Sequence, residues 1–297
     1  MKNYLKLTLY MTGVFILPVL WVISQYGCNA ESKHPVINVA QPAVAGVTTP
    51  TPAPPATAVI ADAATILMRP EVPILCYHQI RDYKPSDSKI SRDYIVPPAS
   101  FSEQMQSLSD SGYHSILPGE LYDYLTTGKQ LPSRPFMITF DDTRLDQYTE
   151  ALPELNKHGF KGVFFIMTVA LNKPGYMSRE QVKQLADEGH IIGSHTYDHK
   201  NVKKYTSDDW VEQVQKPSQQ LQTITGKPIE YFAFPFGLWN KEAISKLKDH
   251  DFKAVFQLAD NRDENDPLYS IRRIIVTGGY GGKSLQKIMI RSFKDHR

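Results

Sequence analysis

The sequence predicts an α/β fold built on a parallel sheet, in one domain that spans residues 72–297. Short apolar runs alternate along it with stretches that carry helix signals, which is the order expected when each strand is followed by a crossover helix. The runs are apolar at nearly every position, as strands buried on both faces are. Their number favours a barrel over a small open sheet.

Each predicted element follows from its own local signal. Ser100 and Glu103 have the spacing of a capping box, and Ser178 is a second N-cap candidate. Glycines end three of the helical stretches, as they do at many helix C-termini. The expected strands are 73–77, 136–140, 162–167, 190–193, 229–234, 254–258 and 271–276, and the expected helices are 100–112, 148–158, 178–189, 241–250 and 285–293.

Composition limits the classes of partner. The 297 residues carry 33 Lys+Arg against 31 Asp+Glu, a net charge of +2, and no long block of one sign. Nucleic acid is therefore not an expected partner, because its binding needs a strongly basic surface. The two cysteines give no disulfide framework, and Cys76, inside an apolar run, is interpreted as a small buried hydrophobe.

The N-terminal residues 1–28 are predicted to target the chain to a membrane. Lys2 and Lys6 precede the uncharged run 7–23, an order that disfavours a buried core helix. A small residue precedes Cys28, as at a bacterial lipoprotein cleavage site, although Gln25 stands where that signal normally has Leu. Lipidation of Cys28, an uncleaved anchor and ordinary cleavage all remain open, and each predicts a location outside the cytoplasmic membrane.

Residues 29–71 are predicted to be a disordered linker. They are rich in Pro, Ala and Thr, and no aromatic residue occurs between positions 31 and 71. Such a segment buries too little apolar surface to offset the entropy lost on folding, and its prolines favour an extended tether.

Polar residues follow the predicted strands, at the end of a parallel sheet where ligands bind. Asp141 and Asp142 are adjacent carboxylates that repel unless a cation or several donors compensate, although the pair also fits a helix N-cap. His195 and His199 have a spacing that can bring both imidazoles to one metal. One Asp with two His leaves a coordination position open, which is typical of a catalytic metal that activates water.

Three motifs in order make the chain similar to a known family. Residues 139–142 (TFDD), 195–199 (HTYDH) and 232–237 (FAFPFG) resemble the first three motifs of the polysaccharide deacetylases, the NodB-homology carbohydrate esterases. The resemblance implies a distorted, incomplete (β/α) barrel of the NodB-homology type. It also implies metal-dependent removal of N- or O-acetyl groups from a glycan, with a polysaccharide as the partner.

The resemblance also implies roles for single residues. Asp141 resembles the catalytic base, and the metal ligands are expected to be Asp142, His195 and His199. Zinc is the expected divalent ion, and cobalt or nickel would also suit these ligands. The turn that holds Pro235 and Phe236 is expected to supply an oxyanion donor, the Phe236 N–H.

Two departures from the family pattern point to a subgroup. The arginine that orients the base is replaced by Ala233, and no late Leu-x-His supplies a general acid. Both losses, together with Tyr77-His78, resemble the poly-β-1,6-N-acetyl-D-glucosamine deacetylases. His78 is expected to do part of the work of the missing histidine, with a purely structural role as the alternative.

Trp239 is the best candidate for stacking on a sugar ring, with packing as the alternative. The function expected from the sequence is a membrane-tethered, extracytoplasmic glycan N-deacetylase. Two alternatives stay open: a peptidoglycan deacetylase or acetylxylan-type esterase, and a catalytically inactive glycan-binding module.

Overall fold

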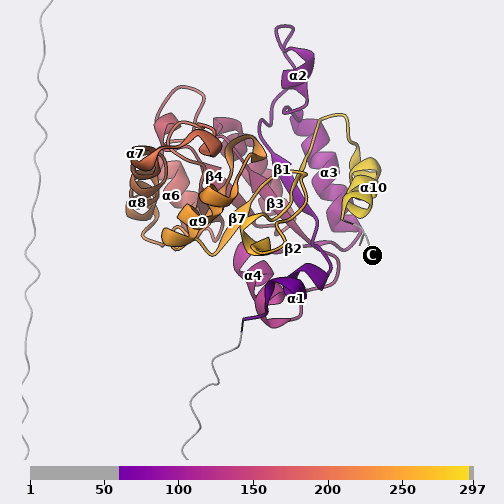
Figure 1. Ribbon diagram of the computed structural model, residues 1–297. Helices are drawn as coiled ribbons and strands as arrows, with labels where there is room; N and C mark the ends of the chain where they lie inside the picture. The colour runs from indigo at the N-terminus through magenta and orange to yellow at the C-terminus, as the bar shows by residue number, and fades with distance from the viewer. Residues whose placement is uncertain (1–59, 294–297) are drawn as a thin grey trace, which may run out of the picture. The chain divides into compact units, whose positions relative to one another are not determined.

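The computed structural model of the protein describes residues 60–293 (Figure 1). The run 7–23, Cys28 and most of the predicted linker lie outside these residues. Within the part of the chain that the structure describes, no helix is long and apolar enough to cross a membrane.

The sheet is parallel throughout, as predicted. Its strands lie in the order β7-β6-β5-β4-β3-β1-β8, and β2 pairs with β3. Each of the seven predicted runs contains one strand, and only the two-residue β2 was not predicted. The strands are β1 (Ile74–Tyr77), β2 (His114–Ser115), β3 (Pro135–Phe140), β4 (Gly162–Ile166), β5 (Ile191–Ser194), β6 (Tyr231–Ala233), β7 (Ala254–Phe256) and β8 (Ile274–Ile275).

The sheet curves until its two ends approach each other. Ile275 pairs with Cys76 in β1, while Ile271, a few residues earlier, forms a parallel bridge with Phe256 in β7. The segment 271–276, which contains β8, therefore lies between β1 and β7. A single bridge rather than a full ladder joins β7 to this segment, which confirms the expected distorted, incomplete barrel.

Helices pack around this sheet, except that α2 projects away from it (Figure 1). The helices are α1 (Ala63–Met68), α2 (Lys89–Arg92), α3 (Pro98–Asp110), α4 (Pro118–Thr127), α5 (Leu152–Lys157), α6 (Arg179–Asp187), α7 (Ser207–Trp210), α8 (Lys216–Thr225), α9 (Lys241–Asp249) and α10 (Gly282–Ser292). Helix α6 begins at the predicted cap, where the Ser178 hydroxyl accepts the N–H of Gln181. The capping box predicted at Ser100 is wrong, because α3 already begins at Pro98, whose fixed φ suits a first helical turn.

The folded region begins before residue 72, so the predicted linker extends too far toward the C-terminus. Asp62 caps helix α1 by accepting the N–H of Thr65 at 2.8 Å. Ile66 of this helix is 3% exposed and packs in a core cluster with Leu121 and Leu125 of α4. The short helix is stabilised by this burial, which its Pro- and Ala-rich surroundings did not predict.

Successive side chains of a strand belong alternately to two hydrophobic clusters, one on each face of the sheet. In β3, Ile138 and Phe140 belong to the cluster under α3, α6 and α10, whereas Met137 belongs to the cluster inside the barrel. Because successive side chains point to opposite faces, the residue that follows Phe140 points inward at the carboxyl end of the strand. That residue is Asp141.

Candidate active site

A cavity of about 360 Å³ lies at the carboxyl ends of the strands, where the sequence placed the site. The residues that line it include His78, Asp141, Asp142, His199, Phe234 and Phe236. They come from the ends of β1, β3 and β6 and from the loop after β5, so the fold brings together residues separated by more than a hundred positions.

The two adjacent carboxylates separate into different surroundings. Asp141 is 3% exposed, whereas the Asp142 side chain is 30% exposed. Asp142 and Thr143 both have left-handed backbones, with φ of 75° and 62°, which turn the chain sharply at the end of β3. Such conformations cost energy in residues other than glycine and cluster at functional sites. Helical backbone begins at Leu145, after Thr143 and Arg144, so the pair does not form the helix N-cap considered as an alternative.

Arg273 holds the buried carboxylate. Its Nη1 and Nη2 donate to the two oxygens of Asp141 at 2.7 and 2.8 Å, and the same guanidinium donates to Thr139 Oγ1 and to the Gln257 carbonyl, both at 3.0 Å. The arginine that seemed lost at Ala233 is therefore replaced by one from the segment before β8. The expectation that no arginine orients the base is therefore wrong, because Arg273 contacts Asp141.

The sequence did contain a signal for Arg273. The predicted strand 271–276 carries this charge between apolar residues. An arginine in a buried strand needs a charged or hydrogen-bonding partner, because an unpaired charge is costly to bury. The run 271–276 alone does not identify the partner of Arg273, because the partner depends on which strands are neighbours in the sheet.

The pair stays ionised. Burial by itself would raise the pKa of Asp141, but the charge of Arg273 and the hydrogen bonds that Arg273 donates outweigh burial and lower it. For Arg273, burial opposes the charged form, and the charge of Asp141 nevertheless raises its pKa. Asp141 is thus held as a buried carboxylate anion, and its role as the catalytic base stays a prediction.

Asp142, His195 and His199 converge as a candidate metal site. Asp142 Oδ1 lies 3.7 Å from His195 Nε2 and 3.6 Å from His199 Nε2. This Oδ1 atom is buried and has no hydrogen-bond partner, so a cation would satisfy it. His195 Nδ1 lies 2.8 Å from the Ala233 carbonyl, which only accepts, so Nδ1 carries the proton and Nε2 keeps its lone pair for a metal. These residues fit a divalent ion.

A turn rather than a helix brings the two histidines together. Thr196 and His199 have φ of 69° and 65°, and the His199 N–H donates to the Thr196 hydroxyl at 2.9 Å. Burial lowers the pKa of His199 to about 4, so its imidazole is neutral at neutral pH. Neutral imidazole is the form that binds metals.

The predicted oxyanion turn lies beside these ligands. Phe236 has φ of 60°, and its N–H donates no hydrogen bond to any described residue. Its ring is 58% exposed and contacts that of His199, with the ring centres 4.4 Å apart. At Gly237 a Cβ would lie 2.7 Å from Leu258 Cγ, and φ is also positive, so only glycine allows this turn. Pro235, buried, begins it.

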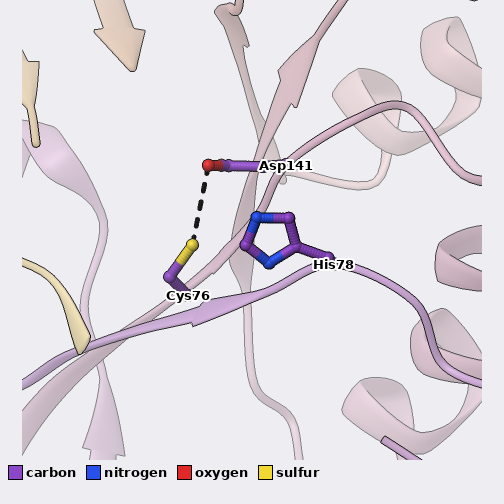
Figure 2. A group of neighbouring side chains, drawn as sticks. All are labelled: Cys76, His78 and Asp141. Atoms are coloured by element: carbon purple, nitrogen blue, oxygen red, sulfur yellow. Dashed lines mark hydrogen bonds between the residues drawn. The ribbon is translucent and has the colours of Figure 1, made fainter. Parts of the chain in front are cut away.

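His78 lies next to the carboxylate (Figure 2). Its ring stacks edge-on against Tyr94 at 4.9 Å, and Nδ1 is buried without a hydrogen-bond partner. Burial lowers its pKa, an effect that the charges of Asp141 and Asp142 oppose. The structure therefore places His78 on the cavity, at the expected end of β1; its role there stays a prediction.

Cys76 is buried, as predicted, but it also has a polar contact. Its Sγ donates to Asp141 Oδ2 at 3.5 Å, the contact drawn in Figure 2. Burial raises the thiol's pKa, so it remains a neutral donor. Cys76, His78 and Asp141 offer ligand atoms within 4.8 Å of one another, but the Arg273 guanidinium already neutralises Asp141, so this group does not suit a cation.

Trp239 is not among the residues that line the cavity. Its ring packs against the cluster that includes Phe234 and Leu247, and its indole N–H donates to Gln257 Oε1 at 3.3 Å. These contacts hold the side chain in place; sugar stacking by Trp239 stays a prediction.

Comparison with known proteins identifies the domain. Residues 128–255 match the family model named polysaccharide deacetylase. The chain carries a polysaccharide deacetylase domain. The matched range begins before β3 and ends in β7, so it includes the motifs that supply Asp141, Asp142, His195, His199 and Phe236. This domain makes the chain a glycan deacetylase enzyme.

Relatives of the deacetylase domain act on more than one glycan. The chain is 26% identical over 226 residues to the poly-beta-1,6-N-acetyl-D-glucosamine N-deacetylase of Staphylococcus epidermidis, covering 68% of this chain and 78% of that protein. It is 27% identical over 188 residues to the peptidoglycan-N-acetylglucosamine deacetylase of Bacillus cereus, covering 61% and 66%. Among solved structures, Streptococcus pyogenes deacetylase PplD superposes with a TM-score of 0.68 at 23% identity, covering 74% of this chain and 99% of that one. This last likeness supports the fold.

Proposed function

We propose that the deacetylase is a metal-dependent N-deacetylase of poly-β-1,6-N-acetyl-D-glucosamine. One observation carries the chemistry: a carboxylate held ionised by Arg273 lies beside the Asp142, His195 and His199 triad in one cavity. The staphylococcal relative with this activity supports the choice of glycan. The N-terminal signals at 7–23 and Cys28 support a location outside the cytoplasmic membrane, with the domain tethered to it.

The described side chains divide the reaction between them. Asp141 takes the proton of the water that attacks the acetamide carbonyl carbon, and Arg273 fixes the orientation of that carboxylate. The free Phe236 N–H donates to the carbonyl oxygen as negative charge develops on it. His78 takes the proton that Asp141 accepted from the water and passes it to the leaving amine as the C–N bond breaks, so acetate and a free glucosamine are the products. When bound by the triad, the metal would polarise the carbonyl and increase the acidity of water.

Acetate release from matched glycans tests the proposal. We expect the metal-loaded protein to release acetate faster from N-acetylated β-1,6-glucosamine oligomers than from chitin oligomers or peptidoglycan. A preference for peptidoglycan would assign the activity of the Bacillus cereus relative instead. The absence of acetate from all three substrates would contradict an N-deacetylase. The inactive-module alternative loses its main support here, because Arg273 supplies the missing guanidinium.

Removing either predicted histidine ligand should remove the metal. We expect His195→Ala and His199→Ala each to lower metal affinity by at least about 10²-fold, since losing even an outer partner of a ligand costs roughly 10- to 100-fold. Elemental analysis of the purified domain measures this loss and also identifies the ion, expected to be zinc. His250→Ala is the matched control, because His250 lies at the end of α9 and does not line the cavity. Full metal content in both ligand variants would show that the triad is wrongly assigned.

A further inference from the structure

A second cavity, of about 340 Å³, adjoins the active site. It shares Gln79, Asp142 and His199 with the cavity described above, so the two meet at the metal triad. Arg144 and Lys173 lie on its wall, and none of the residue roles assigned above uses either of them. A glycan whose acetylated sugar reaches Asp141 has room in this cavity for a neighbouring sugar.

Arg144 is held at the wall without a carboxylate partner. Its guanidinium lies over the Tyr176 ring at 4.9 Å, and its Nη2 donates to the neutral Gln79 Oε1 at 3.2 Å. Its Nε is buried and has no hydrogen-bond partner. Within residues 60–293 neither Arg144 nor the exposed Lys173 forms an ion pair. A buried donor of a charged group without an acceptor is costly, and a ligand oxygen would satisfy it.

No nearby acidic group of the described residues forms an ion pair with Arg144. Asp142 belongs to the metal triad, and Asp198 Oδ2 lies 3.4 Å from Lys200, while Asp198 Oδ1 is buried without a hydrogen-bond partner. Burial raises the pKa of Asp146, and the N–H of Ile80, which donates to Asp146 Oδ1, and the charge of Arg144 oppose this effect; no ion pair joins Asp146 to Arg144. A cation in the triad would increase the positive charge of this cavity further. The cavity is also lined by Asp142 and Asp198, so it is the wall formed by Arg144 and Lys173 that favours an anion.

We propose that this second cavity is a subsite for a carboxylate carried by the sugar next to the one that is deacetylated. The inference rests on the proposed N-deacetylase function but not on the linkage of the glycan. A planar guanidinium with free donors binds a carboxylate through charge-assisted hydrogen bonds, and Tyr176 keeps it in place for this contact. A glycan with a carboxylate on the sugar next to the acetylated one should thus bind more tightly than an uncharged glycan.

Two oligomers that differ in one substituent test the subsite. One is an N-acetylated β-1,6-glucosamine oligomer, and the other is the same oligomer with carboxymethyl ethers on some hydroxyl groups. We expect kcat/KM for acetate release to be about tenfold higher with the carboxymethylated oligomer, the ratio that one charge-assisted contact gives. Most of the difference should lie in KM, because the contact is distant from the reacting atoms. The ratio should fall at high salt, since the cavity is open to solvent.

Variants of Arg144 and Lys173 test whether these side chains cause the preference for the carboxymethylated oligomer. Arg144→Gln should bring the ratio of the two kcat/KM values close to one, and Lys173→Gln, at an exposed position that tolerates substitution, should lower it in part. Arg291→Gln is the matched control, because it removes an exposed arginine on α10. A wild-type ratio of one, or a ratio that Arg144→Gln leaves unchanged, overturns the subsite while the deacetylase function stands. No acetate from either oligomer overturns the proposed function itself.

Discussion

Replacing Arg273 by Met should abolish most of the activity and also destabilise the domain. The substitution leaves the buried Asp141 carboxylate unpaired, and breaking a buried ion pair in this way costs about 3–5 kcal/mol of folding free energy. It also removes the charge that opposes burial, so the pKa of Asp141 rises and the carboxylate is protonated over a wider pH range. We expect kcat to fall by roughly 10² or more at neutral pH.

The pH profile distinguishes this mechanism from simple unfolding. In the wild type the lowered pKa keeps Asp141 ionised, so the ion pair stabilises the domain at neutral pH and is lost only as pH falls through that low value. In Arg273→Met the acid limb of the kcat/KM profile should move to higher pH, and activity should partly return as pH rises.

A double variant and a neighbouring arginine serve as controls. Asp141→Asn combined with Arg273→Met removes both charges, so its melting temperature should exceed that of Arg273→Met while activity stays lost. Arg272 pairs with Glu71 at 2.7 Å, away from the cavity. Arg272→Met should therefore keep kcat, and it should lower the melting temperature less than Arg273→Met, because Glu71 stays in contact with water. If Arg273→Met retained wild-type kcat at neutral pH, Asp141 would not be the base that Arg273 orients.

Replacing His78 by Gln should lower kcat by roughly 10² or more with little change in stability. Its imidazole lies on the cavity beside Asp141, and its Nδ1 makes no hydrogen bond that the substitution would break. Glutamine cannot protonate the leaving amine. Metal content and melting temperature should stay near the wild-type values, as elemental analysis and thermal unfolding can show.

The control for His78 is an exposed histidine. His114 lies in the short strand β2, and its Nδ1 contacts the Ser133 carbonyl at 2.8 Å. His114→Gln should leave kcat unchanged. If His78→Gln instead kept kcat and lost stability, His78 would have the structural role considered as the alternative. The proton would then come from another group, for example Asp141 after it has accepted one from water.

Several features of the domain were determined by local sequence. Apolar runs such as 136–140 predict buried parallel strands, because strands covered on both faces have few polar positions. The carboxyl end of such a strand is where ligands bind, so the sequence alone is enough to place Asp141, Asp142 and His195 at one rim. The helix α1 and the short β2 could not be predicted in this way, because their own residues carry weak signals and neighbouring segments stabilise them.

The partner of Asp141 was decided by the tertiary structure alone. Arg273 lies 132 residues away in the chain, and local pattern specifies no contact at that separation. The two meet because only β1 separates β3 from β8 in the sheet. Both side chains also occupy positions in the alternation along the strand that point into the barrel. Local sequence thus determined which residues stand at the rim. Strand order and register determined which of them face one another, since these depend on packing across the whole sheet.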